Sequence, residues 1–580
     1  MGYPVLGQVR AAGSVRRHFR TSKNRDLRIG MADISAGFDF VVVGAGTAGC
    51  LLAARLSEDP HLRVCLIEAG GSGKSVSVSV PGAIVLAQRS EKLNWRFQST
   101  PQPHLNGRRI PVPRGRGLGG SALINGMVYF RGHPSDYDDW SLAGAVGWSY
   151  REVLPYFCRT ENNRDFPDSP YHGHAGPMHV RNVTRPNPLN FAFFEALSRM
   201  GIEHQSDLNG ANSEGSGLRQ LSIRGGTRET TASALLHPAR SRPNLTVLTN
   251  TRAMRVVLEG RRATGVEALS PDGPLLVPAR REVALCAGTL QSPQLLMLSG
   301  IGDGEHLADL GMPVRNHLPG VGRNLHDHMA SPVHMQMRDP TSYGVSWRAT
   351  PRNLLNVLEY ALLRQGPLAN NIFESAAFVR TIGGLEKPDV QLVFQSARRP
   401  APNFPFPIGH GFAASPVFLY PKSRGRIMLA NPDPLAAPLI NPNLLSVAED
   451  VLPLLRGIRL TRRVFASPAF ARYGATESAP GPQAQSDEEL TAYIRAESYT
   501  VHHPVSTCRM GSDPLAVVDP ELCVVGAEGL RVADASVFPS IIGGNTNAAV
   551  MMVAEKAADL MLGRAPLPAA QPEVASPSHA

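Results

Sequence analysis

Cysteine is scarce in this sequence, and its spacing argues against the sites that cysteines most often build. The chain has 580 residues and six cysteines. No two of them form CxxC or another metal-binding spacing, which argues against a zinc site and against a disulfide framework. We therefore expect no metal, and packed, reduced thiols in a cytoplasmic protein. The six are Cys50, Cys65, Cys158, Cys286, Cys508 and Cys523.

Long apolar runs are also missing. No stretch approaches the roughly 18 residues that a helix needs to cross a bilayer, so we expect no transmembrane segment, although peripheral contact with an inner membrane stays open. The stretch SVRRHFR contains a twin arginine, but the following TSKNRDLRIG has no apolar segment of a signal peptide. An organelle transit peptide and a leader before a true start at Met31 both fit. We favour a disordered basic leader over residues 1–36.

A basic stripe with interleaved aromatic residues, typical of nucleic-acid binding, is absent as well. The formal net charge is +10, from 58 Lys and Arg against 48 Asp and Glu. Half of it lies in residues 1–36, where seven basic residues face two acidic ones (7 − 2 = +5). Because the remaining charge is spread over the chain, a solvated surface explains it, and we expect no nucleic-acid partner.

A dinucleotide-binding pattern opens the ordered part of the chain. The apolar run Phe38–Val43 leads into Gly44-x-Gly46-x-x-Gly49 and then an Ala- and Leu-rich segment. A second apolar run ends at Glu68, 68 − 49 = 19 residues after the last glycine, which is the spacing of a carboxylate that binds a ribose hydroxyl. The pattern predicts strand, glycine turn, helix and strand, with a pyrophosphate at the helix N-terminus. By itself it does not separate NAD from FAD.

The rest of the chain predicts a second domain. A strand-rich block over 244–269 reads as a meander, and REVALCAG (281–288) reads as a further buried strand before the helix TLQSPQLLMLSG. Residues 330–490 suggest antiparallel strands with helices. The last helix, NTNAAVMMVAEKAADLML, ends near Gly563 as its C-cap. The Pro- and Ala-rich residues 566–580 read as a disordered tail.

Five blocks in the right order resemble the glucose–methanol–choline (GMC) oxidoreductase family. They are GRGLGGSALINGMVYFRGHPSDYDDW (115–140), GTLQSPQLLMLSGIG (288–302), GVGRNLHDH (320–328), HHPVSTCRMG (502–511) and LRVADASVFPSIIGGNTNAAVMM (530–552). Two positions depart from the family pattern: Ala122 replaces a small hydroxylated residue or glycine, and Ser506 replaces a glycine. The resemblance covers about 37–565 and implies FAD as the cofactor.

The expected fold class is α/β. A Rossmann-like FAD-binding domain would consist of residues 37–160, 215–330 and 495–565. A substrate-binding domain with an antiparallel sheet and helices would consist of 161–214 and 331–494. The resemblance implies FAD contacts from fifteen residues: Gly44, Gly46, Thr47, Ala48, Gly49, Glu68, Gly119, Asn125, Gly126, Met127, Val128, Met254, Asp534, Ala535 and Asn547.

The catalytic residues follow from the same resemblance. Oxidation of an alcohol needs a base for the hydroxyl proton, and a neutral imidazole suits that task. The family places its catalytic histidine directly before a proline, at His503, and its partner at Asn545, which would orient the alcohol oxygen. If 499–503 is extended, the side chain of His502 points away from that of His503, so it reads as a packed or pocket-wall residue.

Two further residues are weaker candidates for the substrate pocket. Val501 precedes the histidine pair. Glu374 lies in a segment that resembles choline dehydrogenases, where a carboxylate would suit a cationic substrate, although a structural acid is the commoner explanation. The sequence does not identify the alcohol.

The predicted function is FAD-dependent oxidation of a primary alcohol, aliphatic, aromatic or choline-like, to the aldehyde. Electrons would then pass to a quinone-like acceptor or to O2, with a dehydrogenase favoured over an oxidase. Two alternatives stay open. One is a lyase of the same family, a hydroxynitrile lyase or a fatty acid photodecarboxylase, although the latter lack the His/Asn pair. The other is a non-catalytic flavoprotein or nucleic-acid binder.

Overall fold

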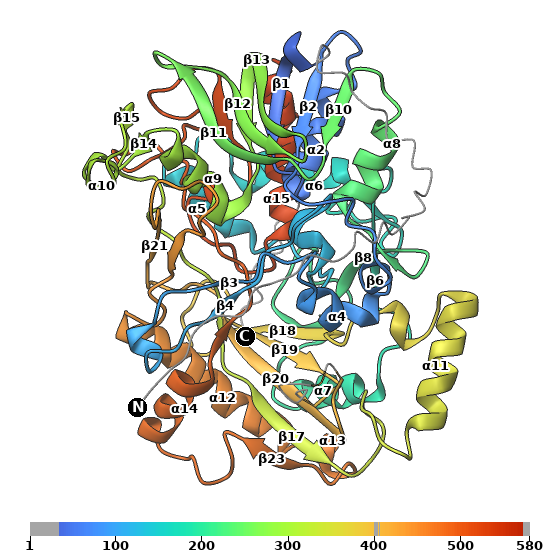
Figure 1. Cartoon of the computed structure of the whole chain (residues 1–580). Helices are drawn as coiled ribbons and strands as arrows, with labels where there is room; N and C mark the ends of the chain where they lie inside the picture. The colour runs from blue at the N-terminus through green and yellow to red at the C-terminus, as the bar shows by residue number, and fades with distance from the viewer. Residues whose placement is uncertain (1–33, 399–403, 405, 572–580) are drawn as a thin grey trace, which may run out of the picture.

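The computed structural model describes residues 34–398, 404 and 406–571. Most of the leader predicted over 1–36 and residues 572–580 of the predicted tail lie outside this range. Within it, two β-sheets lie at opposite ends of the molecule, each covered by helices (Figure 1). The chain passes between the two ends several times, so both domains contain segments that are distant in sequence.

The first sheet has a parallel core of five strands from three separate parts of the chain. Its strand order is β10-β2-β1-β13, and β25 pairs with β13 on the other side of the same core. The bounds are β1 Phe38–Val43, β2 Val64–Ile67, β10 Leu245–Leu248, β13 Gly273–Leu285 and β25 Leu530–Val532. Apolar side chains on both faces are typical of strands that helices cover on both sides.

Strand β13 also belongs to a meander. Its first half pairs antiparallel with β12 (Arg262–Ser270), which pairs with β11 (Arg252–Glu259), and its second half pairs parallel with β1. REVALCAG is therefore not a separate strand, because residues 273–285 run without a break. The two apolar runs that flank EGRRATG form β11 and β12 and pair antiparallel, as predicted, whereas β10 at the start of the same block pairs parallel with β2.

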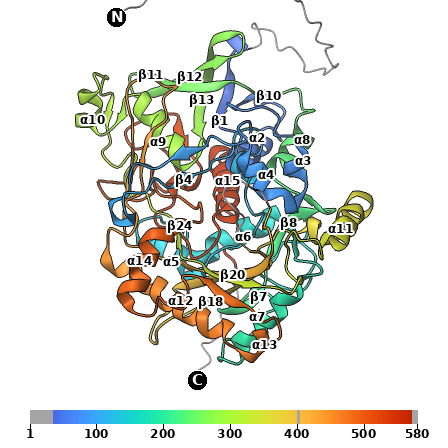
Figure 2. The ribbon, with the colours of Figure 1, turned by 60° about the horizontal axis from the view of Figure 1, so that its bottom comes forward.

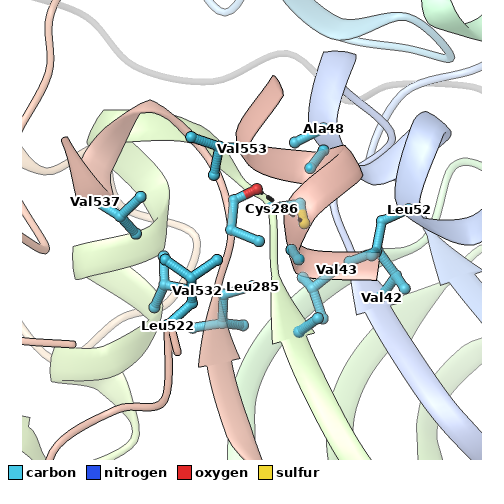
Figure 3. Packing of buried hydrophobic residues seen from close by; sticks show 14 of the residues in the cluster. Val42, Val43, Ala48, Leu52, Leu285, Cys286, Leu522, Val532, Val537 and Val553 are labelled. Carbon is cyan, nitrogen blue, oxygen red and sulfur yellow. Dashed lines mark hydrogen bonds between the residues drawn. The ribbon is translucent and has the colours of Figure 1, made fainter. Parts of the chain in front are cut away.

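Helices α2 (Thr47–Leu56) and α15 (Asn547–Met561) pack together against this sheet, with α9 (Gly288–Leu298) nearby. Figure 3 shows Val43, Leu285, Val532 and Val553 in the shared core, where all four are buried. Across the two helices, the guanidinium of Arg55 pairs with the buried carboxylate of Glu555 at 2.8 Å. The last helix thus completes the domain that the first strand begins.

The second sheet is antiparallel and separates a core from a cavity. Its order is β23-β17-β20-β19-β18-β7; the short strand β16 pairs with β20, and β24 pairs with β16. The bounds are β7 Gly215–Leu218, β16 Met329–Ala330, β17 Val333–Met337, β18 Ser375–Val379, β19 Val390–Gln395, β20 His410–Phe418, β23 Thr476–Ala479 and β24 Tyr499–Thr500. Helices α7 (Pro188–Ser198) and α12 (Val451–Phe465) share a core with one face. On the opposite side of the sheet, alternate residues line the cavity.

The domain boundaries differ from those drawn on the sequence. Strands β7, β16 and β24 lie within segments assigned to the FAD-binding domain, yet they pair with strands of the second sheet. Backbone hydrogen bonds decide to which sheet these strands belong, and strands this short show little hydrophobic pattern in the sequence. At the other end, Gly563 has φ +63° directly after α15, as expected of a C-terminal glycine. Residues 566–571 of the predicted tail are ordered on α6 (Tyr150–Thr160), where the N–H of Leu567 donates to the hydroxyl of Tyr156.

The remaining elements are short or peripheral (Figure 2). The helices are α3 Val76–Ser79, α4 Ile84–Arg89, α5 Pro134–Leu142, α8 His237–Ala239, α10 Gly304–Asp309, α11 Thr350–Leu363, α13 Pro468–Ala471 and α14 Asp487–Glu497. The strands are β3 Phe97–Gln98, β4 Pro111–Val112, β5 Glu161–Asn163, β6 Met178–Asn182, β8 Gln220–Arg224, β9 Thr227–Arg228, β14 Ile301–Gly302, β15 Asn316–His317, β21 Arg426–Met428 and β22 Leu439–Asn441. No helix in the described ranges is long and apolar enough to span a membrane.

Candidate active site

A cavity of about 510 Å³ lies between the two sheets and contains most of the predicted site residues. One half is formed by the β1–α2 turn, the end of β2 and the start of α15. The other half is formed by residues 499–504 and the inner face of the second sheet. Eleven of the fifteen predicted FAD contacts line it: Gly44, Gly46, Thr47, Ala48, Glu68, Asn125, Gly126, Val128, Asp534, Ala535 and Asn547.

The glycines of the β1–α2 turn have different roles. Gly44 has φ +97°, and a Cβ there would lie 2.6 Å from the carbonyl oxygen of Cys286. A Cβ on Gly49 would lie 1.8 Å from the carbonyl oxygen of Gly44, so helix and strand pack too closely for any side chain. A Cβ on Gly46 would meet only the carbonyl oxygen of Cys286, at 4.0 Å, and Gly46 lines the cavity just before α2. The helix N-terminus is thus open to a phosphate.

Glu68 is held rigidly at the end of β2. Its carboxylate accepts backbone N–H groups from Ala45 at 2.9 Å, Gly70 at 2.7 Å and Gly117 at 2.9 Å. Burial raises the pKa of Glu68, and the three N–H groups partly offset that shift. Because three separate segments fix this carboxylate on the cavity wall, it is placed to bind a ribose hydroxyl.

The start of α15 closes the same half of the cavity. Thr47 Oγ1 donates to Asn547 Oδ1 at 2.8 Å and so joins the N-termini of α2 and α15. Asp534 accepts the N–H groups of Gly288 and Ser536, both at 2.8 Å, and the hydroxyl of Ser292 at 2.6 Å. Two helix N-termini and an anchored carboxylate on each side fit a dinucleotide such as FAD.

His503 lies at the other half, in contact with Asn545. The amide Nδ2 of Asn545 donates to His503 Nε2 at 3.0 Å. An amide NH2 only donates, so Nε2 carries the lone pair, and Nδ1–H of His503 is left to donate to His328 Nδ1 at 3.0 Å. Burial lowers the pKa of His503 well below 6.5, and the neighbouring His328 and His502 act in the same direction. The imidazole is therefore neutral and can accept a proton at Nε2.

The backbone around His503 is fixed by residues that the sequence did not single out as functional. The N–H of His503 donates to Asp327 Oδ1 at 2.7 Å, and burial raises the pKa of Asp327 to about 7. Arg114 Nη2 donates to the carbonyl of His502 at 2.7 Å. The family block GVGRNLHDH (320–328) was the available signal for Asp327 and His328. The other histidine of that block, His326, accepts the N–H of Ile541 and contacts the carbonyl of Asn324.

His502 and Ser506 correct the expected geometry of this segment. Strand β24 ends at Thr500, and His502 has φ +66°, so 499–503 is not extended throughout. The side chains of His502 and His503 consequently line the same cavity, together with Val501. Ser506 takes φ +74°, the left-handed region that glycine adopts freely, so the turn keeps this conformation despite the substitution.

Several predicted residues do not reach the cavity. Glu374 was expected near the substrate, but its carboxylate accepts the N–H of Asn187 at 2.9 Å, the amide of Asn190 at 2.6 Å and the hydroxyl of Tyr343 at 2.7 Å. These partners hold it away from the wall, which Ile372 and Phe373 form instead. Four of the predicted FAD contacts do not line the cavity: Gly49, Gly119, Met127 and Met254. Within the described residues, no cluster of three or more His, Cys, Asp or Glu side chains could hold a metal.

Comparisons with known proteins agree with this arrangement. Two family models, both described as GMC oxidoreductase, match residues 38–330 and 421–554. The alcohol dehydrogenase [acceptor] of Pseudomonas putida is 41% identical over 527 residues, 90% of this chain and 96% of that protein. The oxygen-dependent choline dehydrogenase of Brucella ovis is 42% identical over 531 residues, 91% of this chain and 96% of that protein.

Solved structures share the fold over nearly the whole chain. Pyridoxine 4-oxidase from Mesorbium loti superposes with a TM-score of 0.82 at 32% identity, covering 91% of this chain and 100% of that one. A variant of formate oxidase from Aspergillus oryzae superposes with a TM-score of 0.83 at 26% identity, covering 91% and 98%. The likeness thus includes both sheets and the cavity between them.

Proposed function

The chain belongs to the GMC oxidoreductase family, as an FAD-dependent enzyme that acts on CH–OH groups, and we propose that it oxidises a primary alcohol to the aldehyde. When bound, FAD supplies the acceptor for the hydride that leaves the substrate carbon, at its N5 atom. The residues that would hold it are those that line the first half of the cavity, from Gly46 and Glu68 to Asp534 and Asn547.

The contact between His503 and Asn545 carries this proposal. An alcohol oxygen that enters the 3.0 Å contact can accept the Nδ2–H of Asn545, while its hydroxyl donates to Nε2 of His503. The proton moves from the alcohol to Nε2 as the carbon–hydrogen bond breaks. The developing charge on the oxygen is met by the amide of Asn545, which needs no rearrangement because its position is already set.

The test is anaerobic mixing of the FAD-loaded enzyme with a panel of aliphatic, aromatic and quaternary-amine alcohols. We expect alcohols to reduce the flavin, which bleaches its absorbance near 450 nm. The His503→Ala enzyme should keep its FAD, but its flavin should be reduced about 10²–10⁴-fold more slowly, because a general base has been removed. Unchanged reduction by the variant would rule out His503 as the base. Cleavage of a cyanohydrin, or decarboxylation of a fatty acid in light, without flavin reduction by any alcohol would favour a lyase instead.

For the second half-reaction, we propose a quinone-like acceptor or O2, with a dehydrogenase favoured. Reoxidation of the photoreduced enzyme by a soluble quinone and by air, measured side by side, decides between them. A quinone that reacts faster than air-saturated buffer supports the dehydrogenase, and the reverse order identifies an oxidase. The same result tests whether the preference of this chain follows that of the relatives whose names specify an acceptor or oxygen.

We also propose that the enzyme works in the cytoplasm and contacts the membrane peripherally. All six cysteines are free, which fits a reducing compartment. Helix α11 stands at the edge of the second domain (Figures 1 and 2) and exposes five leucines by 48–80%: Leu354, Leu355, Leu358, Leu362 and Leu363. Exposed Arg348 and Arg364 flank these leucines, and apolar residues with flanking cations suit an anionic lipid surface.

Flotation with vesicles that contain phosphatidylglycerol tests this surface. The wild-type enzyme should float with the vesicles, and a Leu355→Glu, Leu362→Glu double variant should not. Leu142→Glu is the matched control, because Leu142 is 86% exposed elsewhere on the molecule. Equal flotation of all three proteins, or of none, would contradict a role for α11.

A further inference from the structure

Arg219 is a buried cation on the wall of the active-site cavity. It follows β7 directly and precedes β8, and it is 3% exposed. It lines the same cavity as His503 and Asn545. Its guanidinium lies near enough to His503 to contribute to the lowered pKa of that histidine. A positive group therefore faces the space in which the alcohol must bind.

The guanidinium has no polar partner among the described residues. Its Nε is buried without a hydrogen bond, and no hydrogen bond or ion pair joins its terminal nitrogens to the described part of the chain. The guanidinium lies over the ring of Phe130, whose centroid is 5.8 Å from Cζ. Burial lowers the pKa of Arg219 to about 9, so the side chain is still charged at neutral pH.

Two other buried arginines have polar partners, although Nε of Arg131 and Nη2 of Arg228 are each buried without a hydrogen bond. Arg131 pairs with the carboxylate of Glu161. Arg228 donates to the carbonyl of Val78 at 3.0 Å and to that of Asn125 at 2.7 Å. Because an unpaired buried charge is strongly unfavourable, a charged side chain at this position needs a partner that the protein itself does not supply.

Glu374 contacts Arg219 through the backbone, but its carboxylate is not that partner. The N–H of Arg219 donates to the backbone carbonyl of Glu374 at 2.9 Å, but the carboxylate of Glu374 is engaged by Asn187, Asn190 and Tyr343. A second donor on the cavity wall is also unused, since Nε2 of Gln391 on β19 is buried without a hydrogen bond. The substrate half of the cavity thus offers donors and positive charge.

We propose that Arg219 binds the carboxylate of a hydroxy acid whose primary hydroxyl group lies at His503. This rests on the alcohol oxidation proposed above. A guanidinium presents two parallel N–H groups that match a carboxylate, and in a buried site such a pair is short and strong. A quaternary ammonium group, in contrast, would meet an uncompensated like charge. The structure therefore separates this chain from a choline-specific pocket.

The test compares 6-hydroxyhexanoate, 1-hexanol and choline as reductants in anaerobic stopped-flow experiments on the FAD-loaded enzyme. For the wild type, we expect the half-saturating concentration of 6-hydroxyhexanoate to be at least about tenfold lower than that of 1-hexanol. Arg219→Met, which keeps the length of the side chain, should bring this ratio close to one, and Arg219→Lys should restore part of it. Arg224→Met is the matched control, because Arg224 lies on β8 but is exposed.

A binding measurement complements the kinetics. Hexanoate carries the carboxylate but no hydroxyl, so it should perturb the flavin spectrum of the wild type without reducing it, and about tenfold more weakly in Arg219→Met. If no alcohol reduces the wild-type flavin, the proposed function fails. If alcohols reduce it but the two C6 substrates bind equally, if choline binds best, or if Arg219→Met keeps the ratio, the assignment of Arg219 fails.

Discussion

The two halves of the cavity differ in how their buried polar groups are satisfied. In the half that fits FAD, Glu68 and Asp534 each accept three hydrogen bonds from the protein, and Thr47 is bonded to Asn547. In the substrate half, polar atoms of Arg219, Gln391 and Asn545 are buried without a partner in the described residues. The first half is fixed by hydrogen bonds within the protein, whereas the second half keeps buried polar groups open to a ligand.

This difference indicates that substrate specificity lies in the substrate half of the cavity. A cofactor that stays bound needs a preformed site, and hydrogen bonds within the protein provide it. A substrate that enters and leaves in every turnover gains affinity from groups that are otherwise unsatisfied, because binding then removes an existing penalty. Variants in the two halves should therefore have separable consequences.

The largest of these effects should come from Asn545→Ala. The substitution removes the donor that meets the developing charge on the alcohol oxygen, so the limiting rate of flavin reduction should fall about 10²–10³-fold. FAD content, measured from the ratio of flavin to protein absorbance, should stay normal. A variant that loses FAD, or one that reduces at the normal rate, would break the division between the two halves.

Glu68→Ala should have the opposite profile. It leaves the N–H groups of Ala45, Gly70 and Gly117 without their acceptor, which costs about 1–3 kcal/mol, and removes the predicted ribose ligand. The affinity for FAD should fall about 10–100-fold, measured by titration of the apoprotein through quenching of flavin fluorescence. Once saturated with FAD, the variant should reduce at the wild-type rate; a slow rate at saturation would contradict this expectation.

A smaller effect should separate two neighbouring glycines of the FAD half. Gly49→Ala forces a methyl group against the carbonyl of Gly44 and should lower the free energy of unfolding by about 1–3 kcal/mol or more. Gly46→Ala meets open space and should change it by less than about 1 kcal/mol. Chemical denaturation of both apoproteins measures the difference, and equal destabilisation would show that the β1–α2 turn relaxes.

The smallest expected effect concerns the pH dependence of flavin reduction, which should show no midpoint at the usual pKa of histidine. Burial, His328, His502, Arg114 and Arg219 hold the pKa of His503 well below 6.5, so its basic form persists as the pH falls through 6.5. The limiting rate of reduction should therefore stay level from pH 8 to pH 6.5 and decline only at lower pH. A decline centred at or above pH 6.5 would show that the substrate half is less enclosed than its geometry indicates.

Sequence reasoning was most informative where local pattern decides structure. The run from Phe38 to Glu68 has the order and spacing of one supersecondary unit, and the family blocks lead directly to His503 and Asn545. The comparisons confirm the family, the α/β fold, FAD and the action on CH–OH groups. The individual roles of the site residues remain predictions that the experiments above address.

The remaining features depend on contacts between distant segments. No local pattern shows that Glu374 is held by Asn187, Asn190 and Tyr343, or that Arg219 is left without a partner. The turn at His502 has the same limitation: the residue takes a left-handed φ just after β24 ends, and its neighbours in the sequence give no sign of this. These are tertiary effects, and a single sequence contains no direct signal for them.

The interleaving of the first domain has a consequence for synthesis on the ribosome. Strand β1 begins at residue 38, but β25 and α15, which complete its sheet and its helical cover, end at residues 532 and 561. The FAD site can therefore close only after the ribosome has synthesised the chain through residue 561. Contacts of such long range fold slowly and leave apolar strands exposed in the meantime, so the yield of folded enzyme should depend on chaperones and on translation speed.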